Sequence, residues 1–391
     1  MKVLNKNLAY LLIGTSSLLG VAHIAMAQQL ELDPNPAPIL VEGAGWVRSV
    51  AQGVSADGSV IFGYVADTTG GATTASVWDS KTGKLTVLQN LALDAGRPFS
   101  ANGASADGKV IFGGTVDAQG VQRPLVWLNE TSTPTGLDAL DANSTAVAHA
   151  ISADGTTIVG SSNSNGALNN GHAVLWSRVN GAYSILDLGT LGGATSAAAA
   201  VSHDGSVIVG SADLDATHNH AAAWYDIDLH AVDLGTLGGN SSARGLSADG
   251  TVIVGQSNLA GGDLRAVAWY GKNANPVNLG VLNGGSSSFA RTVSADGSVI
   301  IGGATYSSTA DTHAVAWYNQ ETTPTDLGTL GGKASDATAV SANGGLSLAM
   351  RRMRAMQSTP WFGLAVRHRR QTLGLWGARL PIRAASLLMG L

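Results

Sequence analysis

The sequence predicts an all-β fold, a β-propeller-like array of about six four-stranded repeats across residues 46–345. One turn motif returns every 45–50 residues, a tryptophan follows it in each interval, and a Gly-rich run closes several intervals. Three motifs that keep one phase over six periods indicate a repeat architecture. The composition agrees, because 51 glycines and 13% charged residues are typical of short strands joined by tight turns.

The turn motif reads Ser-Ala-Asp-Gly or a close variant. It begins at Ser55, Ser105, Ser152, Ser202, Ser247, Ser294 and Ser341. An Asp-Gly pair tolerates the positive φ that a tight hairpin requires. The aspartates in these turns are Asp57, Asp107, Asp154, Asp204, Asp249 and Asp296. Calcium takes roughly six to eight oxygen ligands, so one carboxylate per turn favours a turn role over a calcium site.

The turn separates the first two strands that we expect in each unit. In the unit that begins near Ala197, AAAAVS ends the first strand and the β-branched run SVIVGSA forms the second. A short apolar run that ends in tryptophan forms the third strand. These tryptophans are Trp78, Trp127, Trp176, Trp224, Trp269 and Trp317. Their equivalent positions favour burial in the core over contact with a glycan.

The Gly-rich run is expected to form the fourth strand and the turn into the next unit. It reads DLGTLGG from Asp187, Asp233 and Asp326, and NLGVLNGG from Asn278. It lacks the GxGxxG order and the lysine of a phosphate-binding loop. Four short strands per unit match a propeller blade. A β-solenoid is the alternative, although its rungs are usually shorter.

No catalytic, cofactor or metal site is predicted from the residues. The chain has no cysteine, which excludes thiolate zinc sites, disulfides and a thiol nucleophile. His172, His220 and His313 recur at one position of the unit, where the fifth unit has Arg265, so a packing or hydrogen-bonding role is favoured over metal binding. His218 and His220 form a local histidine pair, and no pair of carboxylates suggests a hydrolase.

Residues 1–27 are expected to be a secretory signal peptide. Two lysines precede the apolar stretch Leu8–Val21, which is too short to span a bilayer stably, and Ala25 and Ala27 supply the small residues of a cleavage site. An uncleaved anchor is the alternative. Residues 28–45 are expected to be a linker with a closing strand, since Ile39–Ser49 resembles a final strand placed before the first unit. No membrane span is expected after cleavage of the signal.

Residues 346–391 are expected to be an out-of-frame tail without regular structure. The tail holds eight arginines and no acid, whereas residues 1–345 hold all 27 acids. Reading the third base of each codon with the first two of the next, Leu346–Gly363 can encode VIVGYATDASDAEHAVVW, and later codons can encode DLGTLGG and a Ser-Ala-Asp-Gly turn. The sequence therefore predicts a one-base frameshift near codons 343–346, which would leave the seventh unit with its first strand alone.

An alternative role for the tail is a basic segment that binds a membrane or nucleic acid. Its arginines do not fall on one helical face, so no nucleic-acid partner is expected.

The combination of HAVAW-type strands, DLGTLGG and Ser-Ala-Asp-Gly turns resembles the HAF-repeat family of extracellular bacterial proteins. The strands that match are His172–Trp176, His220–Trp224 and His313–Trp317. The resemblance implies an autotransporter passenger that a C-terminal β-barrel holds at the outer membrane, and it implies no catalytic residue. This chain departs from that pattern, because no barrel-type strands follow its repeats.

We therefore expect a non-enzymatic, exported repeat protein of adhesin type that binds an unknown surface ligand, a glycan or a protein of host or bacterium. No cofactor is expected. The expected location is the periplasm or the extracellular space for this chain, and the cell surface for the intact family architecture. Two alternatives stay open: a secreted propeller hydrolase that acts on glycans or peptides, and a non-functional truncated product.

Overall fold

The computed structural model describes most of the predicted repeats and a little of the tail. The described residues are 46, 48–67, 72–91, 96–142, 144–163, 171–225, 230–272, 274–306, 311–329, 332–352 and 364–368. The predicted signal peptide and linker lie outside them. Arg48 and Ser49, expected in the closing strand, belong instead to the first strand of the first sheet, where they pair with Ala66 and Val65.

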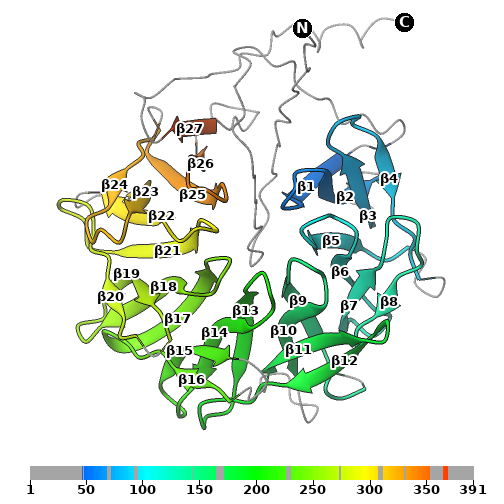
Figure 1. Ribbon diagram of the computed structural model, residues 1–391, viewed down its shortest axis with the longest axis horizontal. Helices are drawn as coiled ribbons and strands as arrows, with labels where there is room; N and C mark the ends of the chain where they lie inside the picture. The colour runs from blue at the N-terminus through cyan, green and yellow to red at the C-terminus, as the bar shows by residue number, and fades with distance from the viewer. Residues whose placement is uncertain are drawn as a thin grey trace, which may run out of the picture.

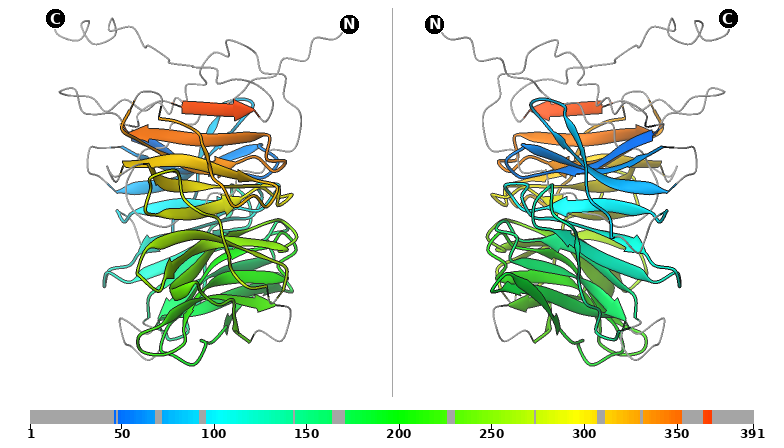
Figure 2. Two further views of the ribbon diagram at one scale, coloured as in Figure 1. Left: turned by 90° about the vertical axis from the view of Figure 1, so that its left-hand side faces the viewer. Right: turned by 90° about the vertical axis from the view of Figure 1, so that its right-hand side faces the viewer.

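The described strands form six four-stranded sheets and a seventh with three strands, which we call sheets 1 to 7 in chain order. Each sheet is an antiparallel meander, and the sheets are arranged in sequence around one axis (Figure 1). In side view the strands run across the thickness of this ring (Figure 2). The all-β propeller prediction is confirmed, and the solenoid alternative does not form.

The strands follow the same radial order in every sheet. The first strands, nearest the axis in Figure 1, are β1 (Arg48–Val54), β5 (Phe99–Ala104), β9 (Ala146–Ile151), β13 (Ser196–Val201), β17 (Gly238–Leu246), β21 (Ser288–Val293) and β25 (Ala334–Val340). The second strands are β2 (Val60–Ala66), β6 (Ile111–Val116), β10 (Thr157–Asn163), β14 (Val207–Asp213), β18 (Val252–Leu259), β22 (Val299–Tyr306) and β26 (Leu346–Arg352).

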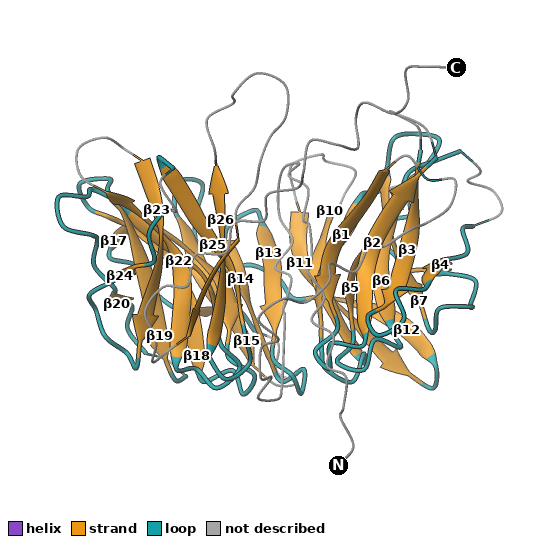
Figure 3. Cartoon of the chain, turned by 90° about the horizontal axis from the view of Figure 1, so that it is seen from above, coloured by secondary structure: helices purple, strands orange, loops and turns teal. Residues whose placement is uncertain are grey.

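The outer half of each sheet begins with the third strand, which in sheets 1 to 6 ends at or near the repeated tryptophan. The third strands are β3 (Thr73–Asp79), β7 (Gln122–Trp127), β11 (Gly171–Val179), β15 (Asn219–Tyr225), β19 (Leu264–Tyr270), β23 (Asp311–Tyr318) and β27 (Leu364–His368). The fourth strands are β4 (Leu85–Val87), β8 (Thr135–Gly136), β12 (Ala182–Asp187), β16 (Val232–Asp233), β20 (Val277–Asn278) and β24 (Thr325–Asp326). Strands are the regular elements of the described chain (Figure 3), and no described helix is long and apolar enough to cross a membrane.

Two strands lie in the segment that was expected to lack regular structure. β26 pairs with β25, and β27 pairs with β26, so the prediction of a single strand in the seventh unit is wrong. Pairing uses backbone groups, and Leu346–Met350 has large apolar residues at alternate positions, a pattern that suits a strand in either reading frame. The rest of the tail lies outside the described residues.

The hydrophobic core is divided among the joints between neighbouring sheets. At the joint of sheets 3 and 4, Val159 and Ala173 of one sheet pack with Ile208 and Trp224 of the other, and all four side chains are buried. The repeated tryptophans of all six complete sheets are at most 2% exposed, and those of sheets 2 to 6 fill the joint with the preceding sheet. A core built from pairs of sheets makes each sheet depend on its neighbours.

The indole N–H of the tryptophans ties sheets 2 to 6 to the sheet before each of them. The Nε1 atoms donate to backbone carbonyls at 2.6–2.8 Å: Trp127 to Gln89, Trp176 to Asp138, Trp224 to Leu188, Trp269 to Leu234 and Trp317 to Leu279. Trp78 of sheet 1 is equally buried, but its Nε1 has no partner among the described residues. The equivalent carbonyl would come from a fourth strand of sheet 7, which the described residues do not include.

In sheets 1 to 6 a glycine of the second strand lies opposite the bulge of the first strand. In sheet 4 the register shifts between Ala198 and Ala200, opposite Gly210. A Cβ on Gly210 would lie 2.0 Å from the carbonyl oxygen of Ala197, a distance that no side chain can occupy. The same contact, at 1.9–2.0 Å, occurs at Gly63, Gly113, Gly160, Gly255 and Gly302. This contact explains why the second-strand motif VIVG ends in glycine.

Replacing Gly210 by alanine should therefore destabilise the ring. We expect Gly210→Ala to lower the free energy of unfolding by about 1–3 kcal/mol or more, because the two strands must separate to admit the methyl group. Urea unfolding followed by tryptophan fluorescence measures the change. Gly261→Ala is the matched control, since nothing lies within 4 Å of a Cβ there and the backbone is not in the left-handed region. Equal unfolding midpoints for the two variants would contradict the role of this contact.

The tryptophan hydrogen bond predicts a difference between two otherwise similar substitutions. Trp224→Phe leaves the Leu188 carbonyl without its buried donor, which costs about 1–3 kcal/mol beyond the lost packing. Trp78→Phe also replaces a buried indole, which packs within sheet 1, but it breaks no hydrogen bond with a described residue. Thermal unfolding of both variants should show the larger loss for Trp224→Phe, and the reverse order would count against this explanation.

Candidate functional site

The aspartates of the turn motif cap their own turns. Asp204 Oδ1 accepts hydrogen bonds from Ser202 Oγ at 2.6 Å and from the amide and hydroxyl of Ser206 at 3.0 and 2.8 Å. Gly205 follows with φ 77°, the positive value expected for this turn. Asp57, Asp154, Asp249 and Asp296 repeat the set, and at Asp107 a lysine replaces the second serine. No group of three possible metal ligands occurs among the described residues.

The backbone of the same turns links neighbouring sheets around the ring. Ala106 N donates to Ala153 O at 2.8 Å, Ala153 N to His203 O at 2.9 Å, and His203 N to Ala248 O at 2.9 Å. The turns at Asp57, Ala248 and Asp296 continue this series in the same direction. The motif therefore serves the fold twice, through its side chain within a sheet and through its backbone between sheets.

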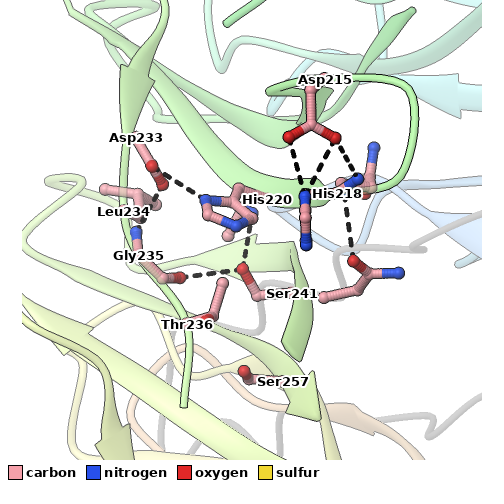
Figure 4. Close-up of polar contacts among 12 residues, drawn as sticks. Asp215, His218, His220, Asp233, Leu234, Gly235, Thr236, Ser241 and Ser257 are labelled. Carbon is pink, nitrogen blue, oxygen red and sulfur yellow. Dashed lines mark hydrogen bonds and ion pairs between the residues drawn. The ribbon is translucent and has the colours of Figure 1, made fainter. Parts of the chain in front are cut away.

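The recurring histidines pair with the aspartate that opens the Gly-rich run. His172 Nδ1 lies 2.8 Å from Asp187 Oδ2, and the pairs His220–Asp233 and His313–Asp326 have distances of 2.8 and 2.9 Å. In sheet 5 both members change together, to Arg265 and Asn278. The two histidines predicted as a local pair bind different carboxylates, because His218 Nδ1 lies 2.8 Å from Asp215 (Figure 4).

Ser241 lies near His220 in Figure 4, but the arrangement is not that of a nucleophile and its base. The Ser241 hydroxyl donates to the carbonyl of Gly235 at 2.8 Å and accepts from the amide of Ala221 at 2.8 Å. Its proton is thus directed to a carbonyl, whereas a nucleophilic serine passes it to the histidine. Ser196, Ser288 and Ser335 make the same two bonds, so this serine joins each of sheets 4 to 7 to the one before it.

Polar residues that do not recur lie at the bulge of the first strands. The residue before the bulge is alanine in all seven sheets, whereas the bulge position varies. The bulge residues are Gln52, Asn102, His149, Ala199, Arg244, Arg291 and Thr338. All are partly exposed, and the first strands contact one another in order from β1 to β25 around the axis (Figure 1). We define these seven residues as the inner ring.

Charge on the inner ring is concentrated in sheets 5 to 7. Arg291 forms an ion pair with Asp336, which lies two residues before Thr338 on the neighbouring first strand. Arg244 makes no hydrogen bond or ion pair with a described residue, and its burial together with the like charge of Arg291 lowers its pKa. Burial raises the pKa of Asp336 despite its arginine partner.

His149 is the titratable member of the inner ring in sheet 3. Its Nδ1 lies 2.7 Å from the carbonyl of Ala198 on the next first strand, and burial lowers its pKa. The ring is thus neutral at sheet 3 and charged at sheets 5 and 6.

Several buried polar atoms at the first strands have no partner among the described residues. They are Gln52 Oε1, Thr338 Oγ1, Arg291 Nε and Asp336 Oδ1. Buried polar atoms in proteins are nearly always hydrogen-bonded, so such groups mark a place where a ligand or water completes the bonding. This makes the inner ring the best candidate for a binding site.

The inner ring was not predicted from the sequence, because the sequence does not show which of the non-recurring polar residues lie at the bulges nearest the axis. The predicted aspartates and tryptophans lie in turns and joints, and none of them belongs to the ring. The signal that would have found it is a single variable position after an otherwise constant alanine, as at Asn102, Arg244 and Arg291. That position becomes significant once the bulge and the radial order of the strands are known.

The turn aspartates predict a stability change in acid. The hydrogen bonds from Ser202 and Ser206 lower the pKa of Asp204 to about 2. Because this folded-state pKa lies below that of an unfolded aspartate, about 3.9, the stabilisation is present above pH 4 and is lost as the pH falls toward 2. Asp204→Asn should be less stable than the parent at pH 7, and this gap in thermal midpoint should close in that window. The exposed Glu130→Gln is the control, and a gap independent of pH would argue against a charge effect.

Comparisons with known proteins support the fold. No protein-family model and no curated protein matches the sequence. Among solved structures, the β-propeller domain of the trilobed protease from Pyrococcus furiosus has a TM-score of 0.51 at 12% identity, covering 81% of this chain and 94% of that one. Prolyl oligopeptidase B from Galerina marginata has a TM-score of 0.55 at 9% identity over 81% of this chain, which corresponds to 48% of its own length. At identities this low the chain shares with both proteins the propeller fold.

Proposed function

We propose that this protein is an exported, non-enzymatic binding protein of the HAF-repeat type, and that its inner ring contacts the ligand. The proposal is supported by a difference in position between the recurring and the non-recurring residues of the repeat. The recurring Asp, Trp, His and Ser residues are engaged in contacts within or between sheets, whereas residues that do not recur gather at the bulges nearest the axis. A binding protein with one ligand needs such a set of non-equivalent side chains at one place.

The cellular context of the proposal rests on sequence features outside the described structure. Residues 1–27 resemble a secretory signal, and the repeat motifs resemble those of surface-displayed autotransporter passengers. In this proposal the chain is exported to the periplasm or the extracellular space. The intact family architecture would hold the repeats at the outer membrane.

A frameshift within the seventh unit is part of the same proposal. The pairing of β25 with β26 sets Ala349 opposite Ala337, the register at which the six preceding sheets have glycine. It also sets Ser347 opposite Val340, where sheet 4 has Ile208 opposite Val201. The displaced frame can encode VIVG over residues 346–349, which supplies isoleucine and glycine at those two positions. The register of the sheet thus favours the displaced frame over the printed one.

The frameshift has two consequences that can be measured. The nucleotide sequence should encode a Trp-terminated third strand and DLGTLGG in the displaced frame, and their absence would refute the proposal. Restoring that frame through the seventh unit should give a chain that unfolds cooperatively and reversibly. The chain as it stands should aggregate on heating, because the described part of sheet 7 has three strands where the other sheets have four.

Binding and hydrolysis can be separated on the full exported chain. We expect saturable binding to one component of a panel of immobilised glycans and extracellular proteins, without turnover of chromogenic peptides or glycosides. The triple variant Asn102→Ala, His149→Ala, Arg244→Ala should bind at least about tenfold more weakly, by analogy with interface positions whose truncation costs more than about 1.4 kcal/mol. The double variant Glu130→Ala, Arg178→Ala, outside the inner ring, should bind like the parent. Turnover that the inner-ring variant abolishes would establish the hydrolase alternative instead.

A further inference from the structure

We propose that Arg244 and Arg291 form a site for an anionic group, a carboxylate or a phosphate, on the inner ring at sheets 5 and 6. The inference rests on the proposed binding function and names the chemical class of the ligand.

The two arginines occupy equivalent positions on adjacent strands. Each is the bulge residue of its first strand, β17 for Arg244 and β21 for Arg291, and these strands contact each other. Both guanidinium groups are partly buried, and they lie close enough for the charge of Arg291 to lower the pKa of Arg244. Two like charges held together in a partly desolvated place repel each other, and an anion between them removes that cost.

The protein supplies one counter-charge for the two arginines. Asp336 pairs with Arg291 through Oδ2, while its Oδ1 and the Nε of Arg291 are buried without a partner among the described residues. Arg244 forms no ion pair with a described residue, and the charge of Asp336 acts on both arginines. A ligand carboxylate or phosphate can accept from both guanidinium groups, whose planar donor arrays suit such anions.

The arginines are not required by the fold at this position. The same bulge holds Ala199 in sheet 4 and Thr338 in sheet 7, and the strand geometry around the bulge is repeated in both. Small neutral residues are therefore compatible with the bulge and with the joints on either side. The positive charge at sheets 5 and 6 needs a reason other than packing, and ligand binding supplies one.

An apolar surface adjoins the proposed site. Phe289 lies two residues before Arg291 on β21 and is partly exposed, and the Arg291 Cζ is 5.7 Å from the centre of its ring. The cation–π contact positions the guanidinium, and the exposed part of the aromatic ring is an apolar surface for the body of a sugar. An acidic sugar, with a uronic carboxylate or a phosphate ester, combines both features.

The test uses the full exported chain with three small probes and one polymer at constant ionic strength. Isothermal titration with galacturonate, glucose 6-phosphate, glucose and polygalacturonate separates a carboxylate source, a phosphate source, a neutral sugar and an acidic chain. We expect saturable binding of at least one acidic probe and none of glucose. Arg244→Gln and Arg291→Gln should each weaken binding about tenfold or more. Asp336→Asn should strengthen it, because a competing carboxylate is removed.

Arg178→Gln, on the third strand of sheet 3, is the matched control and should bind like the parent. The thermal midpoint of Arg244→Gln should stay near that of the parent, because neutral residues already occupy this position in other sheets. Arg291→Gln also loses the ion pair with Asp336, so its midpoint should fall and its binding is measured well below that temperature. Equal binding of glucose, equal binding by the Gln variants, or no binding of any acidic probe would overturn the inference. A ligand from the wider panel that binds independently of both arginines would leave the proposed binding function intact while refuting the anion site.

Discussion

The close approach of the first two strands at a glycine is the constraint on which the rest of the molecule depends. A carbonyl of the first strand lies where the Cβ of any other residue would be, as at Gly210 and Ala197. The approach accompanies a bulge in the first strand, and the bulge turns one residue out of the regular alternation. One steric contact, repeated in sheets 1 to 6, thus lies beside the position at which the sheets differ.

The contacts at the joints between sheets explain why the array folds and unfolds as a unit. A backbone link between turns connects all seven neighbouring sheets, a buried tryptophan adds a bond in sheets 2 to 6, and a serine hydroxyl adds one in sheets 4 to 7. Each contact has its partner in the adjacent sheet. Stability in such an array depends on nearest neighbours, so the first and last sheets are its weakest parts. At sheet 1 the indole Nε1 of Trp78 accordingly has no hydrogen-bond partner among the described residues.

Conservation within the repeat and function in the protein are separated in space. Residues needed by every sheet, such as Asp204 and Trp224, cannot vary without loss of a turn or a joint. The bulge position is not required for a turn or a joint, because alanine, threonine, histidine and arginine all occur at it. The inner ring can therefore acquire a charge pattern of its own, and the pair Arg244 and Arg291 is the part of that pattern that a ligand would recognise.

The sequence alone determined the repeat, its period, the turns at the aspartates and the burial of the tryptophans, because these depend on local turn chemistry and on hydrophobic patterning. The tertiary structure decided that His220 pairs with Asp233 while His218 pairs with Asp215. It also decided that the Ser241 hydroxyl bonds to Ala221 and Gly235 of the preceding sheet, because these contacts join separate elements. The same holds for the inner ring. A residue such as Arg244 is an ordinary polar residue in the sequence, and only the radial order of strands and the bulge opposite Gly255 place it beside Arg291 near the axis.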